Sequence, residues 1–145
     1  MKLTHIDHPL LNRAVSIAIA GHAGRRRKDG QFYITHPFAV MDLVETVEEK
    51  IIAVLHDIVE DTNVSLEELR REFPSDIVDD IDAVTRRDGE SYREFIQRIK
   101  IRGGRAVSVK LADIDHNLED QSALSADERD FLTRRYMRAL EQLYS

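Results

Sequence analysis

A histidine and an aspartate stand side by side within an apolar stretch of the sequence, and this pair limits the folds open to the chain. The stretch is AVLHDIVED, residues 53–61, in which His56 and Asp57 are followed one helical turn later by Glu60 and Asp61. On a helix these four side chains can project from one patch. Burying them costs free energy unless something compensates, and a divalent cation does so because imidazole nitrogens and carboxylate oxygens are its natural ligands. A helix with a charged, solvent-facing edge is the alternative interpretation.

The remaining sequence favours helices over strands. Its apolar residues recur at helical spacing, and three Ser-x-x-Glu patterns, which begin at Ser65, Ser91 and Ser125, are typical of the capping box at a helix N-terminus. The β-branched segment 106–111 could be mistaken for a strand, but its continuation favours a helix with one polar face. A chain of 145 residues is long enough to bury one core. We therefore expect an all-α fold, with a single domain over residues 1–145 that forms a bundle of about six to eight helices.

The composition excludes several kinds of site. The absence of cysteine excludes disulfides, thiolate zinc sites and cysteine nucleophiles, and it suits a reducing compartment. The net charge of −6 argues against a protein that binds nucleic acid by neutralising its phosphates. No segment approaches the roughly 18 apolar residues that span a bilayer, and the N-terminus lacks the apolar core of a signal peptide. We therefore expect a cytoplasmic protein with no nucleic-acid and no membrane partner.

Two further segments place ionisable residues in apolar or constrained surroundings. His36 precedes Pro37, which should hold the histidine backbone extended and fix the direction of its imidazole. Asp113 follows an apolar run and shares one helical face with Lys110 and Asn117. Taken singly, His36 could be a residue at a helix start and Asp113 a salt-bridged core residue. Taken with the histidine-aspartate pair described above, they form a nitrogen and oxygen ligand set suited to Mn²⁺, Fe²⁺ or Zn²⁺.

Charge is segregated along the chain. Residues 25–28 form a short basic run, whereas residues 42–82 are strongly acidic. An acidic region beside a basic loop could hold a metal ion together with an anionic ligand. A solvated surface is the alternative for either segment.

The order of these segments resembles the hydrolase domain of the RelA/SpoT type, which belongs to the HD superfamily. HDIVEDT, residues 56–62, is similar to the signature HDxxEDT of that domain. The residues that resemble its opening are His22, Gly24, Arg27, Gly30, Tyr33, Ile34, His36 and Pro37. The residues that resemble its later segments are Val84, Thr85, Val109, Lys110, Leu111, Ala112, Asp113, His116 and Asn117. Because no synthetase or regulatory segment is recognised, we expect a stand-alone small alarmone hydrolase.

This resemblance implies a helical HD fold and a bound Mn²⁺ ion, whose ligands would be His36, His56, Asp57 and Asp113. It also implies that Glu60 and Asp61 are catalytic and act near the nucleophilic water. The implied activity is removal of the 3′-diphosphate of (p)ppGpp, which yields GDP or GTP and pyrophosphate.

The resemblance also implies contacts with this nucleotide substrate. Arg27 and Lys28 fall where the family places basic residues against the nucleotide, and Asn117 falls where it contacts the base or ribose. Lys110 either pairs with a carboxylate of the site or touches phosphate, and the sequence leaves both roles open.

Several positions depart from the usual pattern of that family, and all of them border the expected pocket. Arg25 stands in place of Gln, Phe32 in place of Pro, and the segment 86–92 is unlike that of other alarmone hydrolases. Other functions therefore stay open: hydrolysis of another nucleotide, such as an adenine alarmone or a deoxynucleotide, nucleotide binding without catalysis in a regulatory module, or a purely structural role. The intact Glu60-Asp61 pair favours catalysis, because a protein that only binds has no need of a carboxylate that orients water.

Overall fold

A computed structural model describes residues 8–145 of the chain. Within this range the chain forms eight helices of at least seven residues and the four-residue helix α4, which confirms the expected all-α bundle. The helices are α1 (Pro9–Gly21), α2 (Thr35–Asp42), α3 (Val47–Leu55), α4 (Ile58–Asp61), α5 (Leu66–Glu72), α6 (Ser75–Ala83), α7 (Tyr92–Arg102), α8 (Gly104–Glu119) and α9 (Ala126–Tyr144). The expectation of one domain over residues 1–145 stays a prediction, since residues 1–7 lie outside the described part.

Capping residues set many of the helix starts. The three expected boxes are present: Ser65, Ser91 and Ser125 each accept a hydrogen bond from the backbone N–H three residues later, and the glutamate there returns one. A fourth capping box, Thr46 with Glu49, begins α3 and was not predicted. Segment 106–111 lies in α8, which confirms the helix expected there.

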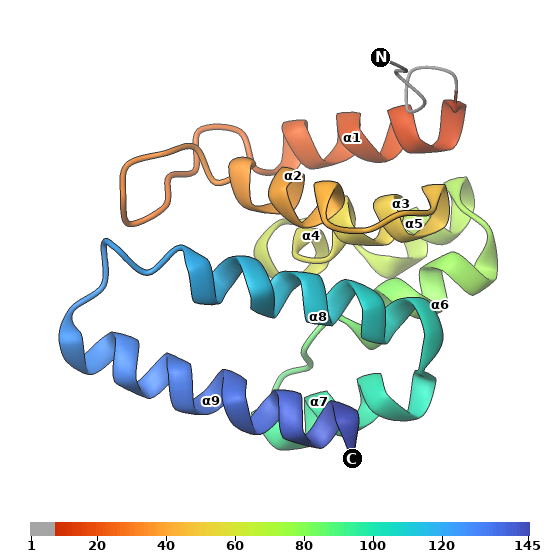
Figure 1. Ribbon diagram of the computed structural model, residues 1–145. Coiled ribbons are helices and arrows are strands. Elements are labelled where there is room, and N and C mark those ends of the chain that lie inside the picture. Colours follow the sequence, from red (N-terminus) through yellow and green to blue (C-terminus); the bar gives the residue numbers. More distant parts are fainter. Residues whose placement is uncertain (1–7) are drawn as a thin grey trace.

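Helix α3 is the centre of the bundle. Its residues 51–55 are all buried, because α1, α2, α6 and α8 pack around it. Figure 1 shows α1 at the top of the molecule, α2 and α3 beneath it, α8 across the middle and α9 with α7 at the bottom. The polar residues that follow α3 therefore emerge from the core directly against α2 and α8.

The backbone around the histidine-aspartate pair differs from the continuous helix that the sequence suggested. Helix α3 ends at Leu55 and α4 starts at Ile58, so His56 and Asp57 occupy the junction between them. The carbonyl of Ala53 would accept the next α-helical hydrogen bond, but the His56 side chain donates to it through Nδ1 at 2.6 Å. The same carbonyl also accepts from the His56 backbone N–H at 3.3 Å, so both the backbone and the side chain of His56 bond to it where α3 ends and the site begins.

The backbone at His36 also differs from the prediction. His36 lies in the first turn of α2 and is helical rather than extended, with its N–H donating to the carbonyl of Tyr33 at 2.9 Å. The preference of a residue before proline for extended backbone is outweighed here, because Pro37 stands in the first turn, where its missing N–H costs no helical hydrogen bond.

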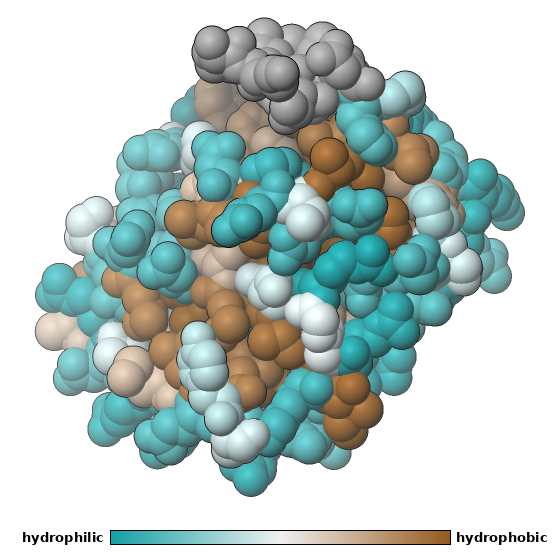
Figure 2. Space-filling view, turned by 45° about the vertical axis from the view of Figure 1, so that its right-hand side comes forward, coloured by the Kyte–Doolittle hydropathy of each residue, from teal (hydrophilic) through white to brown (hydrophobic). Residues whose placement is uncertain are grey.

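The surface mixes charged and apolar side chains. Figure 2 shows one face on which apolar residues gather in a patch surrounded by hydrophilic ones. Among the described residues, none of the helices is both long enough and apolar enough to span a bilayer.

Candidate metal site and adjoining pocket

Three parts of the fold bring the four predicted metal ligands together. His36 comes from α2, His56 and Asp57 from the α3–α4 junction, and Asp113 from α8. His56 Nε2 lies 3.1 Å from Asp57 Oδ2 and 3.3 Å from Asp113 Oδ1. His36 Nε2 lies 2.8 Å from Asp113 Oδ1 and 4.0 Å from Asp57 Oδ2. All four side chains are therefore within reach of one another.

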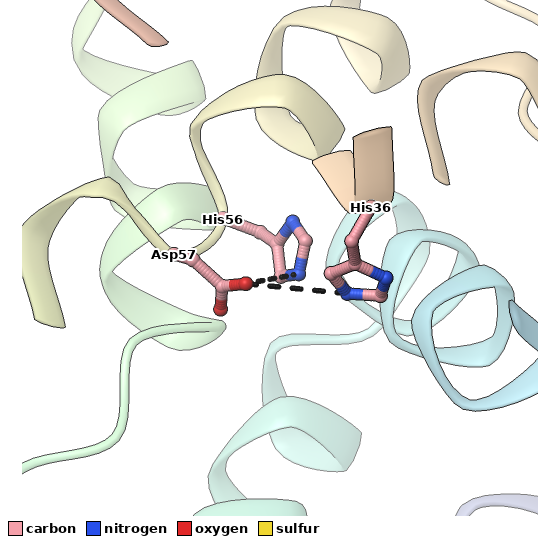
Figure 3. A group of neighbouring side chains, drawn as sticks. All are labelled: His36, His56 and Asp57. Atoms are coloured by element: carbon pink, nitrogen blue, oxygen red, sulfur yellow. Dashed lines mark ion pairs between the residues drawn. The ribbon is translucent and has the colours of Figure 1, made fainter. Parts of the chain in front are cut away.

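Three of these side chains form a compact group of possible ligand atoms. One atom each of His36, His56 and Asp57 lies within 4.8 Å of the other two, and Figure 3 shows the two rings and the carboxylate turned toward one another. Asp113 touches both imidazoles but is not a member of this group of three. Its carboxylate also accepts hydrogen bonds from Lys110 Nζ at 2.9 Å and from Asn117 Nδ2 at 3.2 Å.

The hydrogen bonds of His56 fit a metal ligand. A carbonyl can only accept, so the bond to Ala53 places the proton of the neutral ring on Nδ1 and leaves a lone pair on Nε2. Nε2 is buried and makes no aligned hydrogen bond to any residue in the range 8–145, although it faces two carboxylates. An imidazole oriented through its other nitrogen is the usual arrangement of a histidine that binds a metal.

His36 is held through both of its ring nitrogens, and its Nε2, unlike that of His56, lies within hydrogen-bond distance of a carboxylate. Its Nδ1 shares a hydrogen bond of 2.8 Å with Nδ1 of His116, and its Nε2 faces Asp113. His116 therefore holds the ring from behind without facing the group of possible ligands. The donor set of two imidazoles and two carboxylates, each fixed by a second contact, fits a divalent cation.

The electrostatics of this cluster favour positive charge between the two aspartates. Burial opposes ionisation of His56, but the charges of Asp57 and Asp113 outweigh it and raise the pKa of His56 well above its usual value. Burial would raise the pKa of Asp57, yet the nearby His56 charge lowers it to about 2. Burial likewise opposes ionisation of Asp113, whose pKa falls well below its usual value because of Lys110 and His56. The two carboxylates thus favour a positive charge between them, which a bound cation would supply in place of a protonated His56.

The two predicted catalytic carboxylates differ in their surroundings. Asp61 forms an ion pair with Arg25, with 2.7 Å between Oδ2 and Nη1. Glu60 forms no ion pair with any of the described residues. Desolvation by the surrounding protein, and then the charges of Asp57 and Asp61, raise the pKa of Glu60 to about 7, although the side chain reaches solvent. A carboxylate with that pKa can accept a proton at neutral pH.

A pocket of about 310 Å³ adjoins the cluster. Two of its lining residues contact the aspartates directly, since the Tyr33 hydroxyl donates to Asp57 and the Asn117 amide donates to Asp113. The pocket is lined by Arg25, Arg26, Arg27, Lys28, Asp29, Tyr33, Asn117, Asp120, Ala123, Leu124, Leu132 and Tyr136. It therefore combines a basic wall with an apolar one and opens beside the group of possible metal ligands.

The predicted basic contacts line this pocket and already have partners. Arg27 pairs with Asp120 at 2.7 Å, and Lys28 pairs with Glu128. These pairs join the loop before α2 to the end of α8 and the start of α9. An anionic ligand would have to exchange with these carboxylates to reach the two cations.

Lys110 has a different position from the other predicted substrate contacts. It is only 8% exposed and lies among the rings of Tyr92 and Phe95, with its Nζ bound to Asp113. Of the two roles that the sequence left open, the structure thus favours pairing with a site carboxylate. Lys110 does not line the pocket, so its position gives no support to a contact with substrate.

Several contacts around the site were not predicted. Tyr33 was noted only as part of a motif, yet it bridges the pocket and Asp57, and the Arg25 guanidinium lies 3.8 Å from the centre of its ring. His22 is 2% exposed and packs at 4.9 Å from the same ring, and neither of its ring nitrogens has a hydrogen-bond partner among the described residues. Tyr33 precedes α2, so helical spacing to His36 gave no signal for this contact.

Comparison with known proteins identifies the family to which this chain belongs. Residues 14–144 match the HD domain family. The chain is 34% identical over 128 residues to a guanosine-3′,5′-bis(diphosphate) 3′-pyrophosphohydrolase of Haemophilus influenzae, in a match that covers 78% of the chain. It is 33% identical over 146 residues to a probable enzyme of the same name from Synechocystis, in a match that covers 90% of the chain. The matched segment spans 19% of the length of each of these relatives.

A solved structure has the same fold. It is that of a metazoan ortholog of SpoT, which is described as hydrolysing ppGpp and playing a role in starvation responses. The superposition has a TM-score of 0.81 at 25% sequence identity and covers 91% of this chain and 84% of the other.

Proposed function

Since the chain belongs to the HD domain family and resembles its RelA/SpoT-type hydrolases, we propose that it removes the 3′-diphosphate of (p)ppGpp and releases pyrophosphate. The observation that carries this proposal is the position of the four predicted ligands directly beside a basic pocket. A volume of about 310 Å³ is within the range of small-molecule sites. The names of the relatives support the substrate, and the proposed products are GDP or GTP and pyrophosphate.

We propose that His36, His56, Asp57 and Asp113 hold one divalent cation, and that this cation is Mn²⁺ rather than Fe²⁺ or Zn²⁺. Such an ion polarises a phosphoryl oxygen and lowers the pKa of a water molecule towards neutrality. Because two of the proposed ligands are carboxylates, the site also suits a hard cation. Lys110 and Asn117 hold Asp113 in place through their hydrogen bonds to its carboxylate.

The remaining residues are proposed to act on the water and on the nucleotide. Glu60 accepts the proton of the attacking water, which its raised pKa permits at neutral pH. Asp61 is held by Arg25 and helps to orient that water. Arg27 and Lys28 bind the phosphates, the first through its planar fork and the second as a point charge. Asn117 contacts the ribose or base, and the proposed substrate is a free cytoplasmic nucleotide.

A nucleotide panel tests this function. The purified protein is incubated with ppGpp, pppGpp, the adenine analogue ppApp, GTP and dGTP, each with Mn²⁺, Fe²⁺ or Zn²⁺ in turn. We expect pyrophosphate from the guanosine 3′-diphosphates, no orthophosphate, and the fastest turnover with Mn²⁺. Turnover of ppApp or dGTP in preference to ppGpp would overturn the substrate, and tight ppGpp binding without product would overturn catalysis.

A further inference from the structure

Another concave surface lies between α7 and α9, and it is formed by residues that the proposed function does not use. It is a groove of about 500 Å³, which we call the arginine groove. Figure 1 shows α7 and α9 next to each other at the bottom of the molecule. The groove is lined by Tyr92, Arg93, Phe131, Arg134, Arg135, Arg138, Ala139 and Gln142. None of these residues lines the pocket beside the possible metal ligands.

The arginines of the groove are arranged as one surface. Along α9, Phe131 is followed by arginines three, four and seven positions later, which places them on one face of the helix. Arg93 joins them from the first turn of α7. Four guanidinium groups thus converge on one groove in a protein whose net charge is −6.

These four arginines differ from most other arginines of the bundle. Arg98, Arg102 and Arg105, for example, are each held by carboxylates at 2.6–3.0 Å. No carboxylate of residues 8–145 lies within 4.0 Å of a guanidinium nitrogen of the groove arginines. Like charges that gather without counter-charges repel one another, so an anion bound among them gains a favourable interaction with each.

Aromatic rings give the groove a second type of contact. The Arg135 guanidinium lies 4.5 Å from the centre of the Tyr92 ring and 5.1 Å from that of Phe131. Both distances are typical of cation–π contacts, which hold the guanidinium in place at the groove floor. Phe131 is 57% exposed, so part of its ring is free to contact a planar group of a ligand.

Backbone N–H groups contribute little to ligand binding in the arginine groove. The first N–H groups of α7 are partly used by the Ser91–Glu94 capping box, which also places a carboxylate at that helix start. Binding in the groove must therefore come from the arginine side chains and the rings.

We propose that the arginine groove is a second binding site, and that its ligand is a nucleoside polyphosphate. The concave shape and the volume match a small molecule. Four guanidiniums without a carboxylate partner among residues 8–145 match the oxygens of a phosphate chain, although Arg134 Nε also donates to the Asp130 carbonyl at 3.3 Å. The exposed ring matches a base. Tyr92 also lies 5.6 Å from Lys110 Nζ, so the ligand is separated from the Lys110–Asp113 pair by a single side chain.

The test counts binding sites with GTP, the proposed reaction's product rather than its substrate. Calorimetry at 150 mM salt with the full chain should give two GTP per wild-type chain. Arg135→Ala/Arg138→Ala should remove one of them, with at least tenfold weaker binding in the groove. Arg27→Ala/Lys28→Ala should remove the other. Arg129→Ala, an exposed arginine of α9 outside the groove, is the matched control and should change neither.

Two further ligands test which part of GTP binds in the arginine groove. Guanosine without phosphates should not bind in the groove, and inorganic tripolyphosphate should compete with GTP there. The proposal is overturned if Arg27→Ala/Lys28→Ala abolishes all GTP binding, if Arg129→Ala weakens it as much as the groove variant, or if a single-stranded RNA binds the groove and GTP does not. Circular dichroism confirms that each variant is helical. Because no turnover is measured, a failure of the proposed hydrolysis leaves this result intact.

Discussion

The cluster of possible metal ligands and the adjoining basic pocket hold their charges in opposite ways. In the cluster, His36, His56 and Asp113 are 4–5% exposed, and each lies in contact with at least two other residues. In the pocket, the Lys28 side chain is 59% exposed and that of Arg27 is partly buried, and both pair with carboxylates that a ligand must displace. Buried ionic contacts are costly to disrupt, whereas exposed ones contribute little free energy.

This difference separates the residues that are proposed to carry out the reaction from those that are proposed to bind the nucleotide. The positions of the cluster residues are set by the core, because α3 is buried between α2 and α8 and its end delivers His56 and Asp57 between them. The pocket is set by a loop and by two helix ends, which can change without loss of the core. We therefore expect substitutions in the cluster to abolish activity and substitutions in the pocket to tune it.

The largest expected effect comes from Asp57→Ala. Removing this carboxylate leaves one aspartate for the cation and deletes the acceptor of the Tyr33 hydroxyl. Metal analysis should show that the variant retains no ion, and hydrolysis should fall to that of the metal-free protein. Asp79→Ala, which removes an exposed carboxylate paired with Arg70, is the control and should keep both. A variant of Asp57 that binds metal and turns over normally would refute the proposed site.

Glu60→Gln should cost less, because it leaves all four proposed ligands in place. The amide cannot accept the proton of water, and a lost general base lowers turnover by about 10²–10⁴-fold. Metal content should stay at the wild-type level, which separates this variant from Asp57→Ala. Glu67→Gln, on the exposed side of α5, serves as the control. Wild-type kcat in Glu60→Gln would place the base elsewhere.

The pH profile should report the same carboxylate. The pKa of Glu60 is raised to about 7, so its base form is lost as pH falls through that value, and kcat/KM should decline about tenfold per unit below it. A cation beside Asp57 offsets part of the negative charge that raises this pKa. It therefore moves the decline in kcat/KM to lower pH. The assay is run at saturating metal, because protonation of the histidines also releases metal at low pH. If kcat/KM of Glu60→Gln declines at low pH as it does in the wild type, the decline reports another group.

Much of the fold and the ligand set was predictable because the signals are local. The capping boxes at Ser65, Ser91 and Ser125 involve residues three apart, and each is present as expected. The position of His56 and Asp57 among apolar residues indicated burial beside compensating groups, which the structure places around them. The break between α3 and α4 was missed, because the apolar spacing continues through it and the side-chain bond from His56 to Ala53 that accompanies it has no sequence signal.

The partners of the pocket residues were not predictable for a different reason. Arg25 meets Asp61, and Arg27 meets Asp120, across long stretches of sequence. Any of the many acidic residues of this chain could have served, and only the packing of the helices selects one. The same holds for Lys110, whose choice between a carboxylate and a phosphate depends on how deeply α8 is buried.

The smallest expected effect is tighter substrate binding, and it tests whether the ion pair of Arg27 competes with the ligand. Asp120→Ala removes the carboxylate that now occupies Arg27, so the guanidinium no longer has to exchange partners. An ion pair at the protein surface is worth up to about 1 kcal/mol, and this pair is partly buried, so KM should fall by about fivefold with kcat unchanged. Asp115→Ala removes an exposed charge of α8 that forms no ion pair with the described residues, and it should leave KM as it is. In an Arg27→Ala background the gain should vanish. A higher KM in Asp120→Ala would instead mean that Asp120 positions Arg27 for the ligand, and the contrast between a fixed cluster and an adjustable pocket would fail at this residue.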